Sequence, residues 1–211
     1  MHSYDEAYFT TLYGDMCRQT WADRSRDRLV EKMVARHHVP QGRPPLLDLG
    51  CGYGFLAERF RDRYTLYNSD ISEHAVAMAR KRLPEATFVC ADAERGNPFA
   101  IEFQVVLLVN VLEHLSCPDE TAGRLWDLLL PGGLCVVHLP TINNRLNHYY
   151  YQHSYSRDTT HVYRPSGSEV SELFRSKGFQ VLEESYAPHR PRRLWRGLKL
   201  FPPFLAAYRR P

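Results

Sequence analysis

The amino-acid sequence predicts a doubly wound α/β fold with a mostly parallel sheet of seven strands. From residue 46 onward, short continuous apolar runs alternate with amphipathic segments, and the first run leads into three alternate glycines. Continuous apolar runs are typical of parallel strands covered on both faces. Right-handed crossovers between such strands place helices on both sides of the sheet. A length of 211 residues suits one domain spanning residues 1–211.

The first 45 residues are expected to form a helical lid over the core. Apolar residues recur at helical spacing within residues 4–37, and the segment 38–45 then contains three prolines and one glycine, which end a helix. The apolar positions of the expected helices are Tyr8, Leu12, Leu29, Val30, Met33 and Val34.

The core of the fold, residues 46–140, alternates strands with helices. The expected strands are residues 46–50, 64–70, 87–92, 103–111 and 134–140. The expected helices are residues 55–63, 72–83 and 119–130, the last ended by Pro131-Gly132-Gly133.

Residues 141–165 interrupt this alternation. They are rich in tyrosine, histidine and asparagine and show little periodicity, which predicts an irregular insertion after the fifth strand that lines a binding pocket. Residues 166–211 resume the regular pattern. Ser166 and Glu169 form a capping box for a helix that Gly178 ends, and strands are expected at residues 179–186 and 204–208.

The three alternate glycines carry the strongest functional signal. Gly50, Gly52 and Gly54 follow a buried strand and open a helix, where glycine permits a tight turn and lets the backbone lie against a flat ligand. A dinucleotide site of the G-x-G-x-x-G type requires glycine at position 55, where this chain has Phe55. The spacing therefore favours a nucleoside-containing ligand without a pyrophosphate over a nicotinamide cofactor.

Carboxylates follow the next two strands. Asp70 lies 20 residues after Gly50 at the end of the second strand, where a carboxylate can accept hydrogen bonds from both hydroxyls of a ribose. Asp92 ends the third strand at the same edge of the sheet and can accept a hydrogen bond from an adenine amine. An ordinary exposed aspartate is the alternative interpretation of each.

These segments together resemble a known enzyme family. LLDLGCGYG, NSDIS, CADAE, FQVVLLVNVLEHL and LLPGGLCVV are similar, in order and spacing, to the motifs of class I S-adenosylmethionine-dependent methyltransferases of the small-molecule or sugar type. The resemblance covers residues 46–140 and implies a Rossmann-like fold with S-adenosylmethionine as cofactor. Gln104 departs from the usual aspartate of the fourth strand, at a position that is normally structural.

The resemblance also assigns positions around the cofactor. It implies that the glycine loop surrounds the methionine part, that Asp48 anchors its amino group, that Asp70 binds the ribose and that Asp92 binds the adenine. The end of the fourth strand is expected to line the methionine end and the mouth of the acceptor pocket. The implied cofactor-binding residues are Asp48, Gly50, Cys51, Gly52, Gly54, Asp70, Ile71, Asp92, Ala93 and Asn110.

Methyl transfer from a sulfonium needs mainly alignment, with a general base where the acceptor is a hydroxyl or a protonated amine. His161 is the candidate base because Asp158 and His161 form a D-x-x-H segment similar to one in this family. Alternatively, His161 only ties the insertion to the domain, and a structural role is favoured for His114. The spacing of His148, His153 and His161 matches no known ligand pattern, so no metal site is expected.

The sequence restricts the acceptor only by class. The DNA methyltransferase signature N-P-P-Y is missing after the fourth strand, and Cys117 precedes Pro118 where a pyrimidine-methylating enzyme has Pro-Cys. Residues 188–211 contain seven basic and no acidic residues, so residues 1–187 carry a net charge of −4. We therefore expect a small-molecule, glycan or lipid-linked acceptor, and nucleic acid is disfavoured. The alternative is a regulatory or partner subunit that binds the cofactor without catalysis.

The basic tail and the cysteines bear on where in the cell the protein is found. Residues 190–201 form an amphipathic pattern that suits either weak contact with a membrane surface or a helix packed on the sheet. No apolar run is long enough to span a membrane, no secretory signal precedes the domain, and the five cysteines are dispersed. These features predict a cytoplasmic protein.

Overall fold

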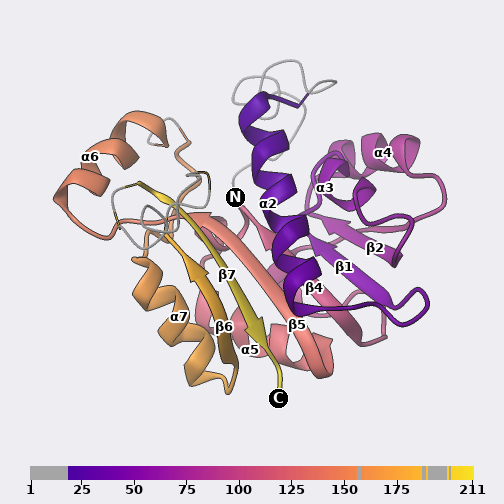
Figure 1. Ribbon diagram of the computed structural model, residues 1–211. Helices are drawn as coiled ribbons and strands as arrows, with labels where there is room; N and C mark the ends of the chain where they lie inside the picture. Colours follow the sequence, from indigo (N-terminus) through magenta and orange to yellow (C-terminus); the bar gives the residue numbers. More distant parts are fainter. Residues whose placement is uncertain (1–18, 156–157, 187–188, 190–198, 200) are drawn as a thin grey trace.

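The computed structural model describes residues 19–155, 158–186, 189, 199 and 201–211 (Figure 1). Its seven strands form one sheet in the order β3-β2-β1-β4-β5-β7-β6. The strands β1 to β5 are parallel, and β7 is antiparallel to both β5 and β6. This confirms the predicted α/β class and the mostly parallel seven-stranded sheet. The strands are β1 (Pro45–Leu49), β2 (Thr65–Asp70), β3 (Thr87–Cys90), β4 (Phe103–Val109), β5 (Leu129–Pro140), β6 (Gln180–Ser185) and β7 (Pro203–Arg209).

Helices cover both faces of the sheet, as Figure 1 shows. Alternate side chains of a strand point to opposite faces, so Leu46 joins the core under α2, α3 and α4, whereas Leu47 joins the core under α5 and α7. The helices are α2 (Trp21–His37), α3 (Phe55–Glu58), α4 (Glu73–Arg82), α5 (Pro118–Leu128), α6 (Arg145–Ser154) and α7 (Gly167–Ser176), with short 3₁₀ turns η1 (Ala93–Arg95) and η2 (Leu112–His114).

Local sequence accounts for the helix starts. The predicted capping box at α7 is present, with the Ser166 hydroxyl accepting from the Glu169 N–H and the Glu169 carboxylate accepting from the Ser166 N–H. Thr20 and Asp23 form a second capping box at α2. Of the predicted N-terminal helices, α2 buries Val30 and its apolar neighbours, whereas Tyr8 and Leu12 lie outside the described residues.

Several predictions of local structure were wrong, among them the helix expected over residues 55–63, which ends at Glu58. Helix α5 ends at Leu128, and the Pro-Gly-Gly segment expected to stop it lies inside the long strand β5. Gly132, at φ 78°, donates its N–H to Arg210 O at 2.8 Å, so this segment pairs with the residue after β7. The insertion, expected to be irregular, contains α6, which begins where the Asn144 side chain accepts from the Asn147 N–H. Figure 1 shows α6 outside the two helix layers, beyond the end of β5.

The expected amphipathic segment 190–201 lies outside the described residues except for Lys199 and Phe201. Within the described part of the chain, no helix is both long and apolar enough to cross a membrane.

Candidate functional site

The glycine loop leaves an opening at the carboxyl end of β1. Gly50, Gly52 and Gly54 all have left-handed backbones, with φ of 80°, 51° and 75°. A Cβ at Gly50 would lie 2.2 Å from a Val111 methyl, and one at Gly54 would lie 3.3 Å from Ala79 Cβ. At Gly52 no atom of the described chain lies within 4 Å of that position. Gly52 therefore borders the space in which a ligand can approach the loop.

Asp70 ties this loop to α4. Its Oδ2 accepts the Gly52 N–H at 2.8 Å and its Oδ1 accepts the Ser72 N–H at 2.9 Å. Burial raises the pKa of Asp70, and these two hydrogen bonds oppose that rise. Each carboxylate oxygen still has a second lone pair for a ribose hydroxyl. Next to it, the Ile71 side chain is 41% exposed, an apolar surface against which a flat base can pack.

Asp92 and Ala93 lie at the neighbouring strand end. The Ala91 N–H donates to Asp70 O at 2.9 Å, so the ends of β2 and β3 are adjacent. Asp92 begins η1, and its Oδ1 accepts the Glu94 N–H at 2.9 Å. The structure thus brings the predicted adenine and ribose positions to one edge of the sheet.

Asp48 is a buried carboxylate inside β1. It is 2% exposed, and its Oδ2 has no hydrogen-bond partner among the described residues. Burial, followed by the neighbouring carboxylates of Asp27 and Asp70, raises the pKa of Asp48 to about 7, against the opposing charge of Arg26. An unpaired buried carboxylate is costly, and the amino group of a bound methionine would supply its missing partner. The carboxylates of Asp48 and Asp70 therefore fit the amino and hydroxyl groups of the cofactor.

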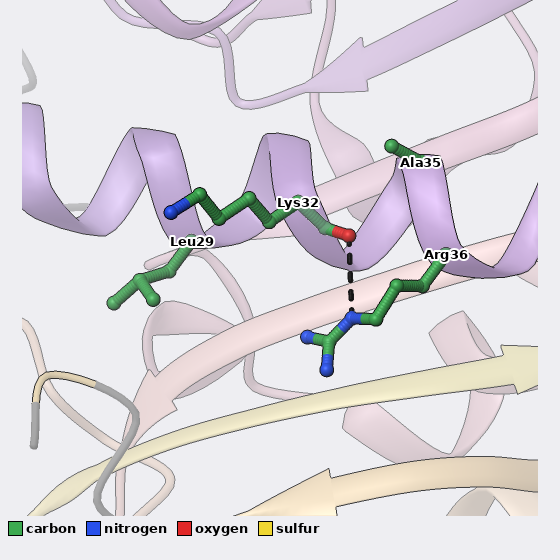
Figure 2. A pocket seen from close by; sticks show the side chains of 4 residues that line it. All are labelled: Leu29, Lys32, Ala35 and Arg36. Atoms are coloured by element: carbon green, nitrogen blue, oxygen red, sulfur yellow. Dashed lines mark hydrogen bonds between the residues drawn. The ribbon is translucent and has the colours of Figure 1, made fainter. Parts of the chain in front are cut away.

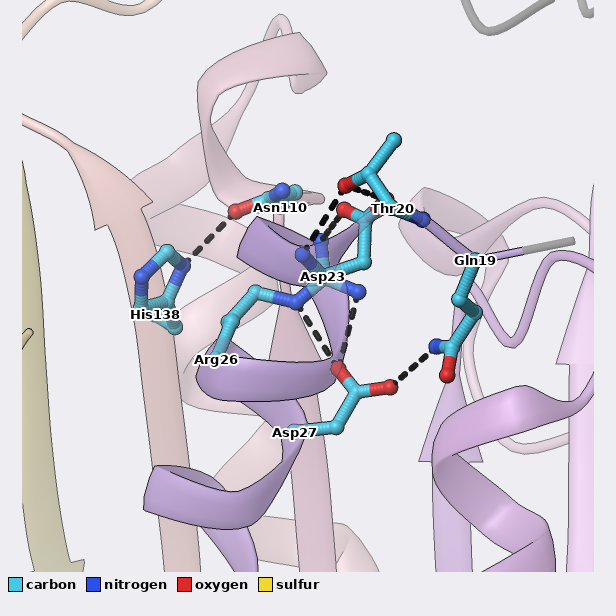
Figure 3. Close-up of polar contacts among 7 residues, drawn as sticks. All are labelled: Gln19, Thr20, Asp23, Arg26, Asp27, Asn110 and His138. Carbon is cyan, nitrogen blue, oxygen red and sulfur yellow. Dashed lines mark hydrogen bonds and ion pairs between the residues drawn. The ribbon is translucent and has the colours of Figure 1, made fainter.

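Sequence reasoning missed the polar residues of α2. The fully buried Asp27 forms an ion pair with Arg26 at 2.8 Å and accepts a hydrogen bond from Gln19. Figure 3 shows these side chains beside the pair formed by Asn110 and His138. The sequence did contain a sign of this buried carboxylate. Asp27 lies three residues before Val30 and seven before Val34, on the buried face of the same helix, where an apolar residue is expected.

Asn110 lies directly after β4 in a strained backbone conformation. Its φ is 55°, a left-handed value that is uncommon for residues other than glycine and that clusters at functional sites. Its N–H donates to His138 O at 2.7 Å, and its side-chain oxygen lies 2.7 Å from His138 Nδ1. Asn110 is thereby fixed at the end of β4.

His161 is a buried residue of the insertion. Its Nδ1 lies 3.0 Å from the Tyr151 hydroxyl, and its Nε2 lies 3.6 Å from Asp158 Oδ2. Its ring packs against that of His114 at 4.7 Å between centroids. Burial, with the charge of His114 next, lowers the pKa of His161 to about 4, while Asp158 opposes this. The ring is therefore neutral at pH 7.

Glu113 completes this cluster; the resemblance placed it at the end of the fourth strand but gave its carboxylate no role. It is 1% exposed, and burial raises its pKa to about 8. The insertion is joined to it, because the Tyr163 N–H donates to Glu113 O at 3.0 Å. One ligand-type atom each from Glu113, His114 and His161 lies within 4.8 Å of the others. His148 and His153, grouped with His161 in the sequence, are instead exposed on α6.

Two surface hollows lie away from these residues. One, of about 410 Å³, opens on α2 (Figure 2) and is lined by Leu29, Lys32, Ala35 and Arg36. The other, of about 380 Å³, is lined by Ile142, Asn143, Asn144, Arg145 and His148. Neither contains the carboxylates or glycines described above, so the candidate site is defined by the strand ends.

Comparison with known proteins assigns the chain to a family. Residues 18–184 match the family described as a methyltransferase domain. The chain belongs to the class I S-adenosylmethionine-dependent methyltransferases. The match includes the glycine loop, the carboxylates at the strand ends, and the insertion. It confirms the resemblance seen in the sequence, and the cofactor of this family is S-adenosylmethionine.

Among its methyltransferase relatives, a trans-aconitate 2-methyltransferase of Variovorax paradoxus (strain S110) is 29% identical over 118 residues, covering 54% of this chain and 45% of the relative. A ubiquinone biosynthesis O-methyltransferase of Azoarcus sp. (strain BH72) is 28% identical over 162 residues, covering 69% of this chain and 68% of the relative. The chain spans about half the length of the trans-aconitate methyltransferases that it matches.

Solved methyltransferase structures share the fold. An S-adenosylmethionine-dependent methyltransferase from Clostridium acetobutylicum ATCC 824 has a TM-score of 0.72 at 11% identity and covers 96% of this chain and 97% of its own. The N-methyltransferase NodS from Bradyrhizobium japonicum WM9, in complex with S-adenosyl-l-homocysteine, has a TM-score of 0.69 at 15% identity, with coverages of 94% and 92%. At such identities the similarity concerns the fold alone.

Proposed function

We propose that this protein transfers a methyl group from S-adenosylmethionine to an oxygen or nitrogen atom of a small molecule, a sugar or a lipid-linked intermediate. The observation that carries the proposal is the opening at Gly52, next to which Asp70 holds the loop and Asp48 presents an unpaired carboxylate oxygen. The printed names of the relatives, which concern trans-aconitate and ubiquinone biosynthesis, support a small-molecule acceptor.

The proposed cofactor orientation follows from the strand ends. Adenine lies at Asp92 and Ala93 against Ile71, and the ribose lies at Asp70. The methionine part follows the glycine loop, with its amino group at Asp48. Arg26, the cation of α2 whose charge acts on Asp48, faces the methionine carboxylate.

The reaction is a single in-line displacement. A lone pair of the acceptor attacks the methyl carbon, the bond from that carbon to sulfur breaks, and its electron pair stays on sulfur as S-adenosylhomocysteine forms. Alignment supplies most of the acceleration. We propose His161 as the catalytic residue on the acceptor side, since its neutral ring is oriented by Tyr151 and Asp158.

Replacing His161 tests this assignment. In His161→Ala, turnover on the true acceptor should fall by about 10²–10⁴ if the ring takes the acceptor proton, while affinity for S-adenosylhomocysteine is preserved. His153→Ala, an exposed histidine on α6, is the control and should retain wild-type turnover. Acceptors are screened by radiolabelled methyl transfer to hydroxyl- and amine-bearing compounds. Turnover within a few fold of wild type in His161→Ala would remove His161 from catalysis.

The membrane contact expected of residues 190–201 is a further part of the proposal, would suit a lipid-linked acceptor, and is here extended to the described helix α6. Leu146, Tyr149 and Tyr150 are exposed at helical spacing on α6, which has no acidic residue. Wild-type protein should bind anionic vesicles at low salt, and the double variant Leu146→Ser/Tyr149→Ser should bind them more weakly. Val39→Ser, at another exposed apolar position, is the control. If the wild type does not bind vesicles, the membrane contact is excluded and the acceptor is a freely diffusing molecule.

A further inference from the structure

We propose that Glu113, His114 and His161 form a binding site for one divalent transition-metal ion of the zinc and cobalt type. Glu113 and His114 come from η2, directly after β4, and His161 comes from the insertion 47 residues later. Two imidazoles and a carboxylate are a ligand set that such ions accept. Metal binding itself does not depend on the proposed methyl transfer, but its catalytic use does.

The three side chains already converge. One ligand-type atom from each lies within 4.8 Å of the other two. In a tetrahedral zinc site with bonds of about 2.0–2.2 Å, ligand atoms are about 3.3 Å apart. The ligand atoms are therefore at most about 1.5 Å farther apart than in such a site.

The Glu113 carboxylate points to a missing cation. The side chain is 1% exposed, and Oε2 has no hydrogen-bond partner among the described residues. A buried acceptor without a partner costs free energy, and a carboxylate in this position is stabilised by a bound cation. Arg26 acts on it only as a minor electrostatic influence. A metal ion held jointly with two histidines would satisfy this oxygen.

The histidines are oriented as metal ligands usually are. A metal-binding histidine typically bonds through its second ring nitrogen to a fixed polar group. His114 Nδ1 lies 2.8 Å from Thr160 Oγ1, and Thr160 is held in turn by Asp158 Oδ1. His161 Nδ1 lies 3.0 Å from the Tyr151 hydroxyl. Each ring is therefore held through one nitrogen by a polar side chain, as the histidines of metal sites usually are. Asp158 Oδ2, 3.6 Å from His161 Nε2, lies beside the site.

The position of the site explains what the ion would do. It lies at the end of β4, where the family resemblance places the mouth of the acceptor pocket. Glu113, His114 and His161 would hold the ion, and a bound cation would lower the pKa of an acceptor hydroxyl next to it, so that the hydroxyl would lose its proton to solvent more readily. With the ion bound, His161 would serve as its ligand, in place of the proton-accepting role proposed above for the metal-free site.

Cobalt(II) is the probe, because its visible absorption reports ligand binding without any assay of activity. Protein freed of metal with a chelator is titrated with Co²⁺, and the stoichiometry is measured by calorimetry. We expect one ion per chain and a higher unfolding temperature when it is bound. Glu113→Gln should bind far more weakly. Thr160→Val, which removes the hydroxyl that joins His114 to Asp158, should lose affinity by about 10–100-fold.

The control variant is His153→Ala, which should bind Co²⁺ as the wild type does. The inference is overturned if the wild type shows no saturable Co²⁺ binding and no change in unfolding temperature. Equal Co²⁺ affinity of the wild type and Thr160→Val, with both folded, would overturn it as well, as would loss of binding in His153→Ala. S-adenosylhomocysteine binding, measured on the same samples, reports separately on the proposed function.

Discussion

Replacing Gly52 by alanine separates what the loop contributes to folding from what it contributes to binding. A Cβ at this position meets no described atom within 4 Å, so the substitution causes no clash inside the protein. Its cost to the fold comes from φ, which is 51°. A left-handed backbone costs an L-residue about 1–2 kcal/mol, which corresponds in a domain of this size to about 2–8 °C of unfolding temperature.

A matched control exists in the same sheet. Gly132 has φ 78°, and a Cβ there also meets no described atom within 4 Å, but it lies in the Pro-Gly-Gly segment of β5, away from the strand ends that form the site. Gly132→Ala and Gly52→Ala should therefore lose similar stability in thermal unfolding. Only Gly52→Ala should lose affinity for S-adenosylhomocysteine, by at least about tenfold, or about 1.4 kcal/mol.

The assay is calorimetric titration of both folded variants with S-adenosylhomocysteine. If the two variants retain equal affinity, the cofactor does not lie against Gly52 and the orientation given above is wrong. If Gly52→Ala fails to fold while Gly132→Ala folds, the space next to the loop is not open to ligand, and the reasoning from it fails.

Two further predictions concern the carboxylates. Since the pKa of Asp48 is raised to about 7 by burial and by Asp27 and Asp70, with Arg26 opposing, the group is largely protonated below that pH. Affinity for the cofactor should then rise with pH up to about pH 7 and fall by up to about tenfold for each pH unit below it. Asp48→Asn should bind the cofactor weakly, with an affinity that does not change with pH. An affinity that still changes with pH in that variant would assign the effect to another group. Asp70→Asn should weaken calorimetric binding of S-adenosylhomocysteine by about 1–3 kcal/mol, whereas Asp62→Asn, an exposed control, should not. Equal affinity in these two variants would take Asp70 out of the site.

The parts of the site that follow directly from a strand could be predicted from the sequence. Gly50, Gly52, Asp70 and Asp92 each lie at or just after the end of an expected strand, and parallel strands bring their carboxyl ends to one edge. Because neighbouring residues in the sequence determine these positions, short motifs are enough to predict them. The cofactor was therefore predictable, and the family match agrees with it.

What depends on distant segments could not be predicted. Glu113 and His161 are 48 residues apart in the chain, and only the packing of the insertion on η2 brings them together. Helix α6 escaped detection because asparagine, histidine and tyrosine have modest helix propensity and its buried positions are few. The place of β7 between β5 and β6 is equally invisible in a pattern of apolar residues, which gives the existence of a strand but not its neighbours.

That strand order has a consequence for biosynthesis. Strand β7 separates β5 from β6, yet the ribosome makes it after both. Between Pro140 and Arg209 the nascent chain grows for roughly 3–14 s at ordinary translation rates. During that interval the apolar edge of β5 has no antiparallel neighbour and β6 has nothing to pair with. Unpaired edges of this kind are prone to aggregate. Chaperones that cover them during translation should therefore affect the yield of this protein more than chaperones that act after its release.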